Sequence, residues 1–169
     1  CPKIVETFGS AEFWGLRMSP DLVGTDAAAD LPLPDNVRRY YIPSVTHGGG
    51  TGTFSLKGDG PLSGCKLLNN PLPSRETMNV ALRALIDWVR TDARPPKSVY
   101  PKLAAGDLVA PDPEAIGWPH IPGAPTPAGK LNPFWDYEFG KSFNARDLSG
   151  AADILPPRIR REQRSVQST

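Results

Sequence analysis

The sequence predicts an α/β fold: a strand–strand–helix portion of a doubly wound parallel sheet, followed by a proline-rich irregular extension. Two runs of β-branched and aromatic residues, 3–8 and 37–43, are typical of buried strands. One long amphipathic pattern after Ser74 indicates a helix. The chain of 169 residues also holds 20 prolines and 16 glycines, and the prolines crowd residues 96–133, where regular elements are expected to be short.

Each of these elements has recognisable ends. The first strand ends at Gly9, and the second ends at Pro43, which has no backbone N–H for a ladder. The helix is expected to begin after Ser74, whose hydroxyl can cap it, and to stop before the proline pair at 95–96. We expect its apolar stripe to pack in the core: Met78, Ala81, Leu82, Leu85, Ile86, Trp88 and Val89.

The chain divides into three parts by composition. Residues 1–95 carry the predicted strands and helix, 96–157 form a Pro- and aromatic-rich extension expected to wrap over the core, and 158–169 are expected to be a disordered basic tail. Two strands and one helix do not cover both faces of a parallel sheet. We therefore expect the remaining strands in a partner chain or in a segment upstream of residue 1.

Charge and composition exclude several classes of function. The formal net charge is +1 with 22% charged residues, so nothing predicts binding to nucleic acid. No stretch reaches the roughly 18 apolar residues of a membrane span. His47 and His120 lack metal-ligand spacing, so neither a metal nor a cofactor is expected.

The two cysteines, Cys1 and Cys65, allow at most one internal disulfide. An internal bridge, two independent thiols, and a bond from Cys1 to another chain all remain open, since spacing does not establish the Cα separation.

The candidate site combines residues that follow the two strands. Glu12 comes after the first strand in Gly9-Ser10-Ala11-Glu12, and His47 after the second in a turn followed by Gly48-Gly49-Gly50. In this order a carboxylate can hold the tautomer of an imidazole, and the imidazole can act as general base toward a serine. No serine here has a Gly-x-Ser-x-Gly setting, so the sequence predicts two members of a catalytic triad without the third.

Alternatives remain for each of these residues. His47 can be a solvated or hydrogen-bonded loop histidine, and Glu12 can be a surface carboxylate or form a salt bridge with Arg17. The His-Gly-Gly-Gly string is also an oxyanion-hole motif, but that interpretation requires a downstream nucleophile elbow, which is absent. The alternative acids for His47 are Glu6, Asp21 and Asp26.

Two aromatic residues, Phe13 and Trp14, directly follow the acid. They are candidates for the wall of a substrate pocket, and core packing is their alternative role.

Several strings of the chain together resemble the C-terminal part of a bacterial family of alpha/beta hydrolase domain proteins. They are Pro2 to Thr7, Ser10 to Trp14, Asp30 to Tyr41, Thr46 to Gly50, Gly64-Cys65, Leu85 to Val89, Tyr100 to Val109, Phe139-Gly140 and Asp147 to Gly150.

The resemblance implies an α/β-hydrolase fold and hydrolysis of a small carboxylic ester. His47 falls where the family's catalytic histidine is expected, and Glu12 where its acid is expected. The nucleophilic serine would lie on an N-terminal segment or chain, and export of many members implies a periplasmic or secreted location. The rival hypothesis is a non-catalytic structural or interaction subunit whose segment 96–157 binds a partner or a saccharide.

Overall fold

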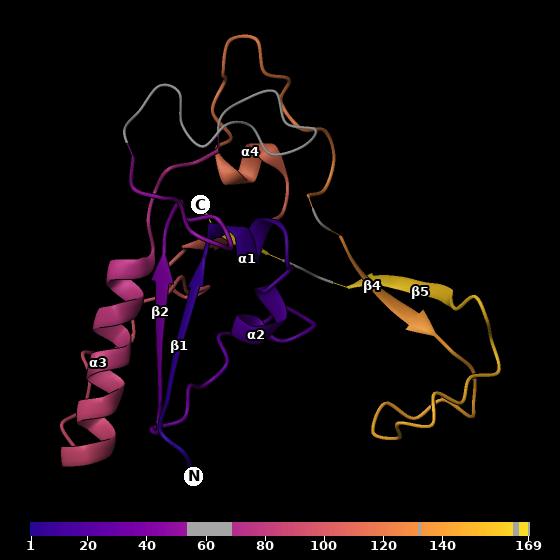
Figure 1. The fold of residues 1–169 in the computed structure, drawn as a ribbon. Helices are drawn as coiled ribbons and strands as arrows, with labels where there is room; N and C mark the ends of the chain where they lie inside the picture. Colours follow the sequence, from indigo (N-terminus) through magenta and orange to yellow (C-terminus); the bar gives the residue numbers. More distant parts are fainter. Residues whose placement is uncertain (54–68, 132, 164–165, 169) are drawn as a thin grey trace.

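The computed structural model describes residues 1–53, 69–131, 133–163 and 166–168 (Figure 1). Cys65 lies outside the described residues, and with it the predicted pairing with Cys1, whose side chain is exposed. The described part combines helices with three two-stranded sheets, which agrees with the α/β class. A larger doubly wound sheet is not formed within these residues.

The two predicted strands are confirmed, and they pair in parallel. Strand β1 spans Ile4–Gly9 and strand β2 spans Val37–Ile42, with Ile4 opposite Val37 and Gly9 opposite Ile42. Parallel pairing requires a crossover, and residues 10–36 supply it. Because the strands are parallel and in register, both end at the same edge of the sheet. Glu12 follows the end of β1, and His47 follows the end of β2.

The two outer margins of this strand pair differ. The outer margin of β2 is bonded to Val99, whose N–H donates to Arg39 O (2.9 Å) and whose carbonyl accepts from Tyr41 N–H (2.8 Å). Within the described residues, β1 has β2 as its only strand neighbour. The margin of β1 is thus open to a further strand.

One face of the strand pair is covered by the crossover. Helices α1 (Ser10–Trp14) and α2 (Ser19–Val23) lie there (Figure 1). Their apolar side chains join a core cluster that also draws on distant segments: Phe8, Phe13, Leu22, Val23, Ala27, Leu108 and Val166. Phe13 is completely buried, and full burial of such a side chain stabilises a fold by about 1.5–3 kcal/mol.

The predicted helix is confirmed as α3 (Arg75–Thr91), which packs against β1. Ser74 occupies the N-cap position, but its hydroxyl makes no capping hydrogen bond, so the predicted cap is wrong; its helix-like backbone, with φ −113° and ψ −12°, is not the extended one of a capping residue. The chain leaves the helix at Asp92 in the left-handed conformation.

The expectation that the whole apolar stripe of α3 is core is also wrong. Of the stripe, Ala81 and Trp88 are buried, whereas Leu82 is 56% and Val89 61% exposed. The reason is that the strand pair is narrower than the stripe, so it covers only one side of it. Lys3 Nζ and Arg38 Cζ both lie over the Trp88 ring, 5.5 Å and 5.2 Å from its centroid.

The extension holds short elements, as its prolines predict. Strand β3 is Leu108–Val109, helix α4 is Pro113–Ile116, and strand β4 is Phe134–Glu138. Helix α4 begins at Asp112, whose side chain accepts a hydrogen bond from Ala115 N–H at 2.8 Å. Figure 1 shows α4 beyond the carboxyl ends of β1 and β2.

The predicted disordered tail is wrong. Strand β5 (Arg158–Gln163) pairs antiparallel with β4, and strand β6 (Gln167–Ser168) pairs antiparallel with β3. Between them Val166 enters the core, with 4% of its surface exposed. Pairing with distant strands gives order to a segment whose own composition predicts none.

Candidate active site

The acid-bearing turn is built by the direct passage from β1 into α1. Glu12 is the third residue of α1, and its Oε2 accepts a hydrogen bond from Gly9 N–H at 2.6 Å. This contact is half of a capping box and holds the carboxylate at the end of β1. Gly9 is required here, because a Cβ at this position would lie 2.9 Å from Val45 O.

The histidine-bearing turn follows β2 and is closed by backbone hydrogen bonds. Gly49 N–H donates to Thr46 O at 2.9 Å, and Gly50 N–H donates to Leu72 O at 2.7 Å. A Cβ at Gly50 would overlap the backbone of Pro71, which explains a glycine at this point. Both amides are committed to carbonyls, so they are not free to form an oxyanion hole, and the structure gives that alternative no support.

The two predicted site residues are in contact. His47 Nδ1 lies 2.7 Å from Glu12 Oε1. Because the ionised carboxylate is an acceptor, it favours a proton on Nδ1 and leaves Nε2 as the basic nitrogen of the neutral ring. Glu12 is sheltered, with 18% of its side chain exposed, whereas 76% of the His47 side chain is exposed.

The surroundings of Glu12 keep it ionised. Burial by itself would raise its pKa, but hydrogen bonds from His47 and from Gly9 N–H outweigh burial, so the pKa of Glu12 lies below its ordinary value. At neutral pH the group beside His47 is therefore a carboxylate. This arrangement can orient an imidazole and stabilise its protonated form.

The alternative partners of these two residues make other contacts. Glu6 pairs with Arg39 at 2.6 Å, and Asp26 accepts a hydrogen bond from Ala28 N–H. Among the described residues, the His47 ring forms its hydrogen bond with Glu12, and no described serine hydroxyl bonds to its Nε2.

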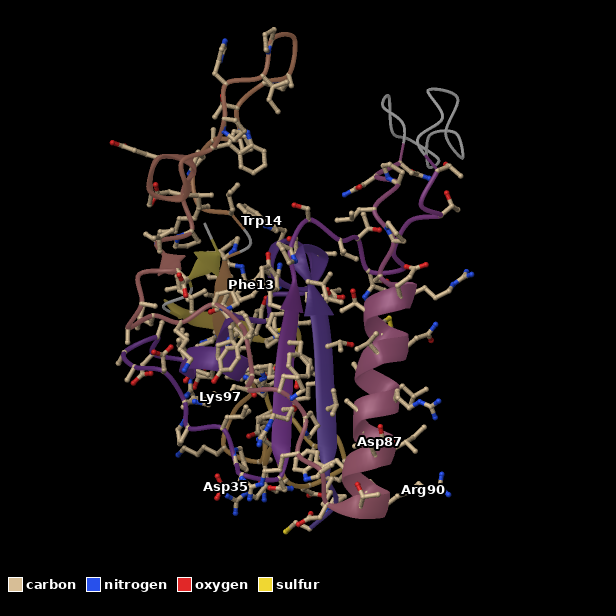
Figure 2. All side chains as sticks on the ribbon, turned by 90° about the vertical axis from the view of Figure 1, so that its left-hand side faces the viewer. Phe13, Trp14, Asp35, Asp87, Arg90 and Lys97 are labelled. Carbon is tan, nitrogen blue, oxygen red and sulfur yellow. The ribbon has the colours of Figure 1, made fainter. Side chains whose placement is uncertain are left out.

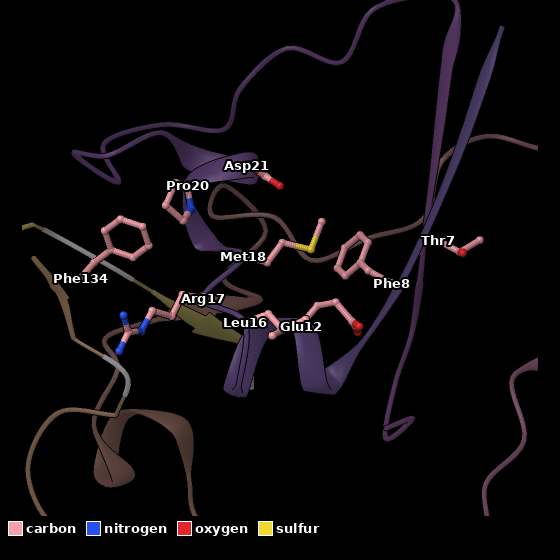
Figure 3. Close-up of a pocket in the computed structure, with 9 residues that line it drawn as sticks. All are labelled: Thr7, Phe8, Glu12, Leu16, Arg17, Met18, Pro20, Asp21 and Phe134. Atoms are coloured by element: carbon pink, nitrogen blue, oxygen red, sulfur yellow. The ribbon is translucent and has the colours of Figure 1, made fainter. Parts of the chain in front are cut away.

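Two hollows adjoin the pair, and both border β1. The smaller has a volume of about 190 Å³ and is lined by Thr7, Phe8, Gly9, Glu12, Ile42, Val45, Thr46, His47, Ser74 and Met78. The larger, about 410 Å³, lies between β1, α1 and α2 (Figure 3) and is lined by Thr7, Phe8, Glu12, Leu16, Arg17, Met18, Pro20, Asp21 and Phe134. Glu12 therefore stands between two spaces along the same strand.

The aromatic residues after the acid have different environments. Phe13 is completely buried among core side chains, which corrects its assignment to a pocket wall: as the inward-facing residue of α1 it packs against Phe8 and Tyr41. Trp14 is partly buried and meets Trp118 edge to face at 5.5 Å. Figure 2 shows Trp14 beyond the end of the strands, toward the segment that follows α4.

The described residues contain no group of three or more histidine, cysteine or acidic side chains arranged to hold a metal ion. They also contain no helix with the length and apolarity needed to cross a bilayer.

Comparison with known families gives one match. Residues 5–132 match the sequence model of the family described as "Alpha/beta hydrolase domain", so the chain belongs to this family. This confirms the resemblance, and it associates the chain with hydrolases in general. No curated protein and no solved structure matches the chain.

The sequence did not single out the residues that join the two turns, namely Ser10, Tyr41 and Ser44. The available sequence signal is a serine that directly follows a strand and comes shortly before an acid. This signal does not identify the partners of Ser10, because they lie 31 and 34 residues away in the sequence.

Proposed function

We propose that this chain forms the C-terminal part of a serine carboxylic-ester hydrolase, with His47 as general base and acid and Glu12 as its orienting carboxylate. The 2.7 Å contact between His47 Nδ1 and Glu12 Oε1 at the common end of two parallel strands carries the proposal. Membership of the hydrolase family supports it. The order acid then histidine along the chain is the order that this fold uses.

In the proposed reaction, the serine hydroxyl gives its proton to His47 Nε2 as its oxygen attacks the ester carbonyl. The imidazolium then returns the proton to the departing alkoxide, and a water molecule repeats the two steps to release the acid. Glu12 stays ionised throughout, as its lowered pKa favours.

The serine is proposed to lie on polypeptide outside this sequence, seated against β1. Three observations support this placement. The outer margin of β1 has no strand neighbour among the described residues, the His47 ring is largely exposed, and Met78 lines the hollow beside His47. From Met78 (50% exposed) the apolar stripe of α3 continues through Leu82 and Val89. A parallel strand added beside β1 would cover this stripe and bring its own carboxyl end toward His47.

One observation favours the rival function, a binding subunit. On and next to the β4–β5 hairpin, Tyr137 is 42%, Phe143 41% and Leu148 fully exposed, and Phe139 stacks on Phe143 at 4.4 Å. Exposed aromatic surface of this kind is typical of protein-binding patches.

The deciding experiment measures hydrolysis of p-nitrophenyl butyrate by the complete protein, that is, this chain with the polypeptide that carries the serine. We expect His47→Ala to lower kcat by at least about a thousandfold, and Glu12→Gln by a smaller but still large factor. His120→Ala and Glu114→Gln are matched controls, because both residues are exposed and line neither hollow.

A fluorophosphonate probe on the same protein should label one serine of the accompanying polypeptide. Near-normal turnover by His47→Ala would remove His47 from the mechanism. Absence of both turnover and labelling in the wild type would favour the binding subunit.

A further inference from the structure

Three consecutive residues at the start of α1 bond to the histidine-bearing turn. Ser10 Oγ accepts from Ser44 N–H at 2.8 Å, Ala11 N–H donates to Val45 O at 3.3 Å, and Glu12 meets His47 at 2.7 Å. Only the last contact involves the proposed catalytic pair. The first joins the Ser10 side chain to the backbone of the turn, and the second joins the two backbones directly.

Ser10 also ties this junction to the core. Its Oγ lies 2.7 Å from Tyr41 Oη. The Tyr41 ring packs against Phe8 at 5.3 Å and against Phe13 at 5.8 Å between ring centroids. The hydroxyl of Ser10 thus connects the histidine-bearing turn, through Tyr41, to Phe8 and Phe13 of the core cluster.

The backbone of Ser44, which donates to Ser10, has a strained conformation that neighbouring hydrogen bonds must stabilise. Ser44 has φ +61°, a left-handed conformation that non-glycine residues rarely adopt. Its N–H is bound by Ser10, and its carbonyl accepts from Asn70 Nδ2. Asn70 Oδ1 in turn accepts from Leu72 N–H at 3.0 Å, so the turn is held from both sides.

We propose that Ser10 is a positioning residue that sets the placement of His47 relative to Glu12. This inference deepens the proposed function and rests on it. A mostly exposed imidazole held by one side-chain contact is free to swing unless the backbone beneath it is fixed. Ser10 supplies that restraint, because it bonds the turn three residues before His47 and is itself two residues before Glu12.

The test compares Ser10→Ala with Ser98→Ala in the complete protein. Ser98 is the matched control: it is also partly buried, and its Oγ also accepts from a β2 backbone N–H, that of Arg39, at 3.0 Å. It lies on the opposite margin of β2 and touches neither turn. Ser10→Thr keeps the hydroxyl and serves as the rescuing variant.

With p-nitrophenyl butyrate, we expect Ser10→Ala to lower kcat by about 10- to 100-fold with KM changed less than about twofold, since a small misplacement of a catalytic group has effects of this size. Ser98→Ala should leave kcat within about twofold. Ser10→Thr should recover most of the lost rate.

A second readout does not depend on turnover. In 15N-histidine NMR of the same proteins, with the His47 signals assigned by their loss in His47→Gln, wild-type His47 should hold its proton on Nδ1 when neutral. Ser10→Ala should move the ring toward a mixture of both tautomers, and Ser98→Ala should not. The inference is overturned if Ser10→Ala leaves the tautomer unchanged, or if both alanine variants change rate and tautomer alike. A tautomer change without any esterase activity in the wild type would retain the positioning role and reject the proposed hydrolysis instead.

Discussion

The two faces of the β1–β2 pair contrast sharply. On the face covered by α1 and α2, Phe13 is 0% and Leu22 1% exposed. On the face covered by α3, Met78 is 50% and Leu82 56% exposed, although these residues belong to an equally apolar pattern. Within the described residues, the first face is fully covered, and the apolar stripe of α3 on the second face is covered along one side only.

The difference separates the face whose core is completed by the described residues from the face that these residues leave partly exposed. The closed face is built from the crossover that directly follows β1 and from Leu108 and Val166, which the described chain itself supplies. The open face runs along the free margin of β1 and begins at the hollow beside His47. The proposed catalytic pair thus lies at the end of β1, between the closed face and the face that the described residues leave partly exposed.

The largest expected effect tests the closed face. Phe13→Ala should lower the free energy of unfolding by about 3–5 kcal/mol, because it leaves a cavity in a tightly packed cluster. The matched change on the open face, Leu82→Ala, should alter it by about 0.5 kcal/mol or less in the 169-residue chain. Urea unfolding of both variants makes the measurement. Equal losses would show that the two faces are equally packed in solution and would remove the contrast.

A charge introduced on the open face is expected to have an effect of intermediate size on stability. This effect differs between the 169-residue chain and the complete protein. Leu82→Lys should leave the stability of the 169-residue chain nearly unchanged, but in the complete protein it should lower stability by about 3 kcal/mol, because the charge is then buried without a partner.

Asp87→Lys is the control for this experiment, since Asp87 is exposed and, five residues after Leu82, lies about 140° further around the axis of α3; Figure 2 shows Asp87 on this helix. It should be tolerated in both contexts. If Leu82→Lys is equally harmless in the complete protein, nothing covers this face and the proposed placement of the serine-bearing polypeptide fails.

The smallest expected effect is on the pH dependence of the free energy of unfolding, and it comes from Glu12. The pKa of Glu12 is lower in the folded protein than its ordinary value, so between these two values the unfolded chain binds a proton that the folded chain does not. The contribution of Glu12 is therefore complete above the ordinary pKa of a glutamic acid, about 4.3, and is lost as the pH falls through the lower folded value.

Glu12→Gln should accordingly be less stable than the wild type by about 1 kcal/mol at pH 7, with a gap that narrows as the pH approaches 3. Urea unfolding at a series of pH values measures this gap. A gap that is constant with pH would mean that the carboxylate charge contributes nothing to the contact with His47.

Local sequence patterns predicted the secondary-structure elements that depend mainly on residues close together in the sequence. The β-branched runs of β1 and β2 and the periodicity of α3 were readable because they depend on near neighbours. The approach of Glu12 to His47 was also predictable, since parallel strands in register bring their carboxyl ends to one edge.

The failures share one cause, which is dependence on distant segments. Arg158–Gln163 became a strand because β4 offers it a partner, which its own composition does not reveal. The periodicity of α3 identified its apolar residues but not what covers them. The contacts of Ser10 were missed because its hydroxyl bonds to Ser44 and Tyr41, which are remote in sequence.

The sequence by itself determined the order of the elements and the chemistry placed at their ends, because both follow from side-chain type and from spacing along the chain. The tertiary structure decided which apolar surface is closed, which margin of β1 is open and how the two turns are joined. These properties arise from contacts between segments far apart in the chain, and such contacts exist only once the backbone has closed on itself.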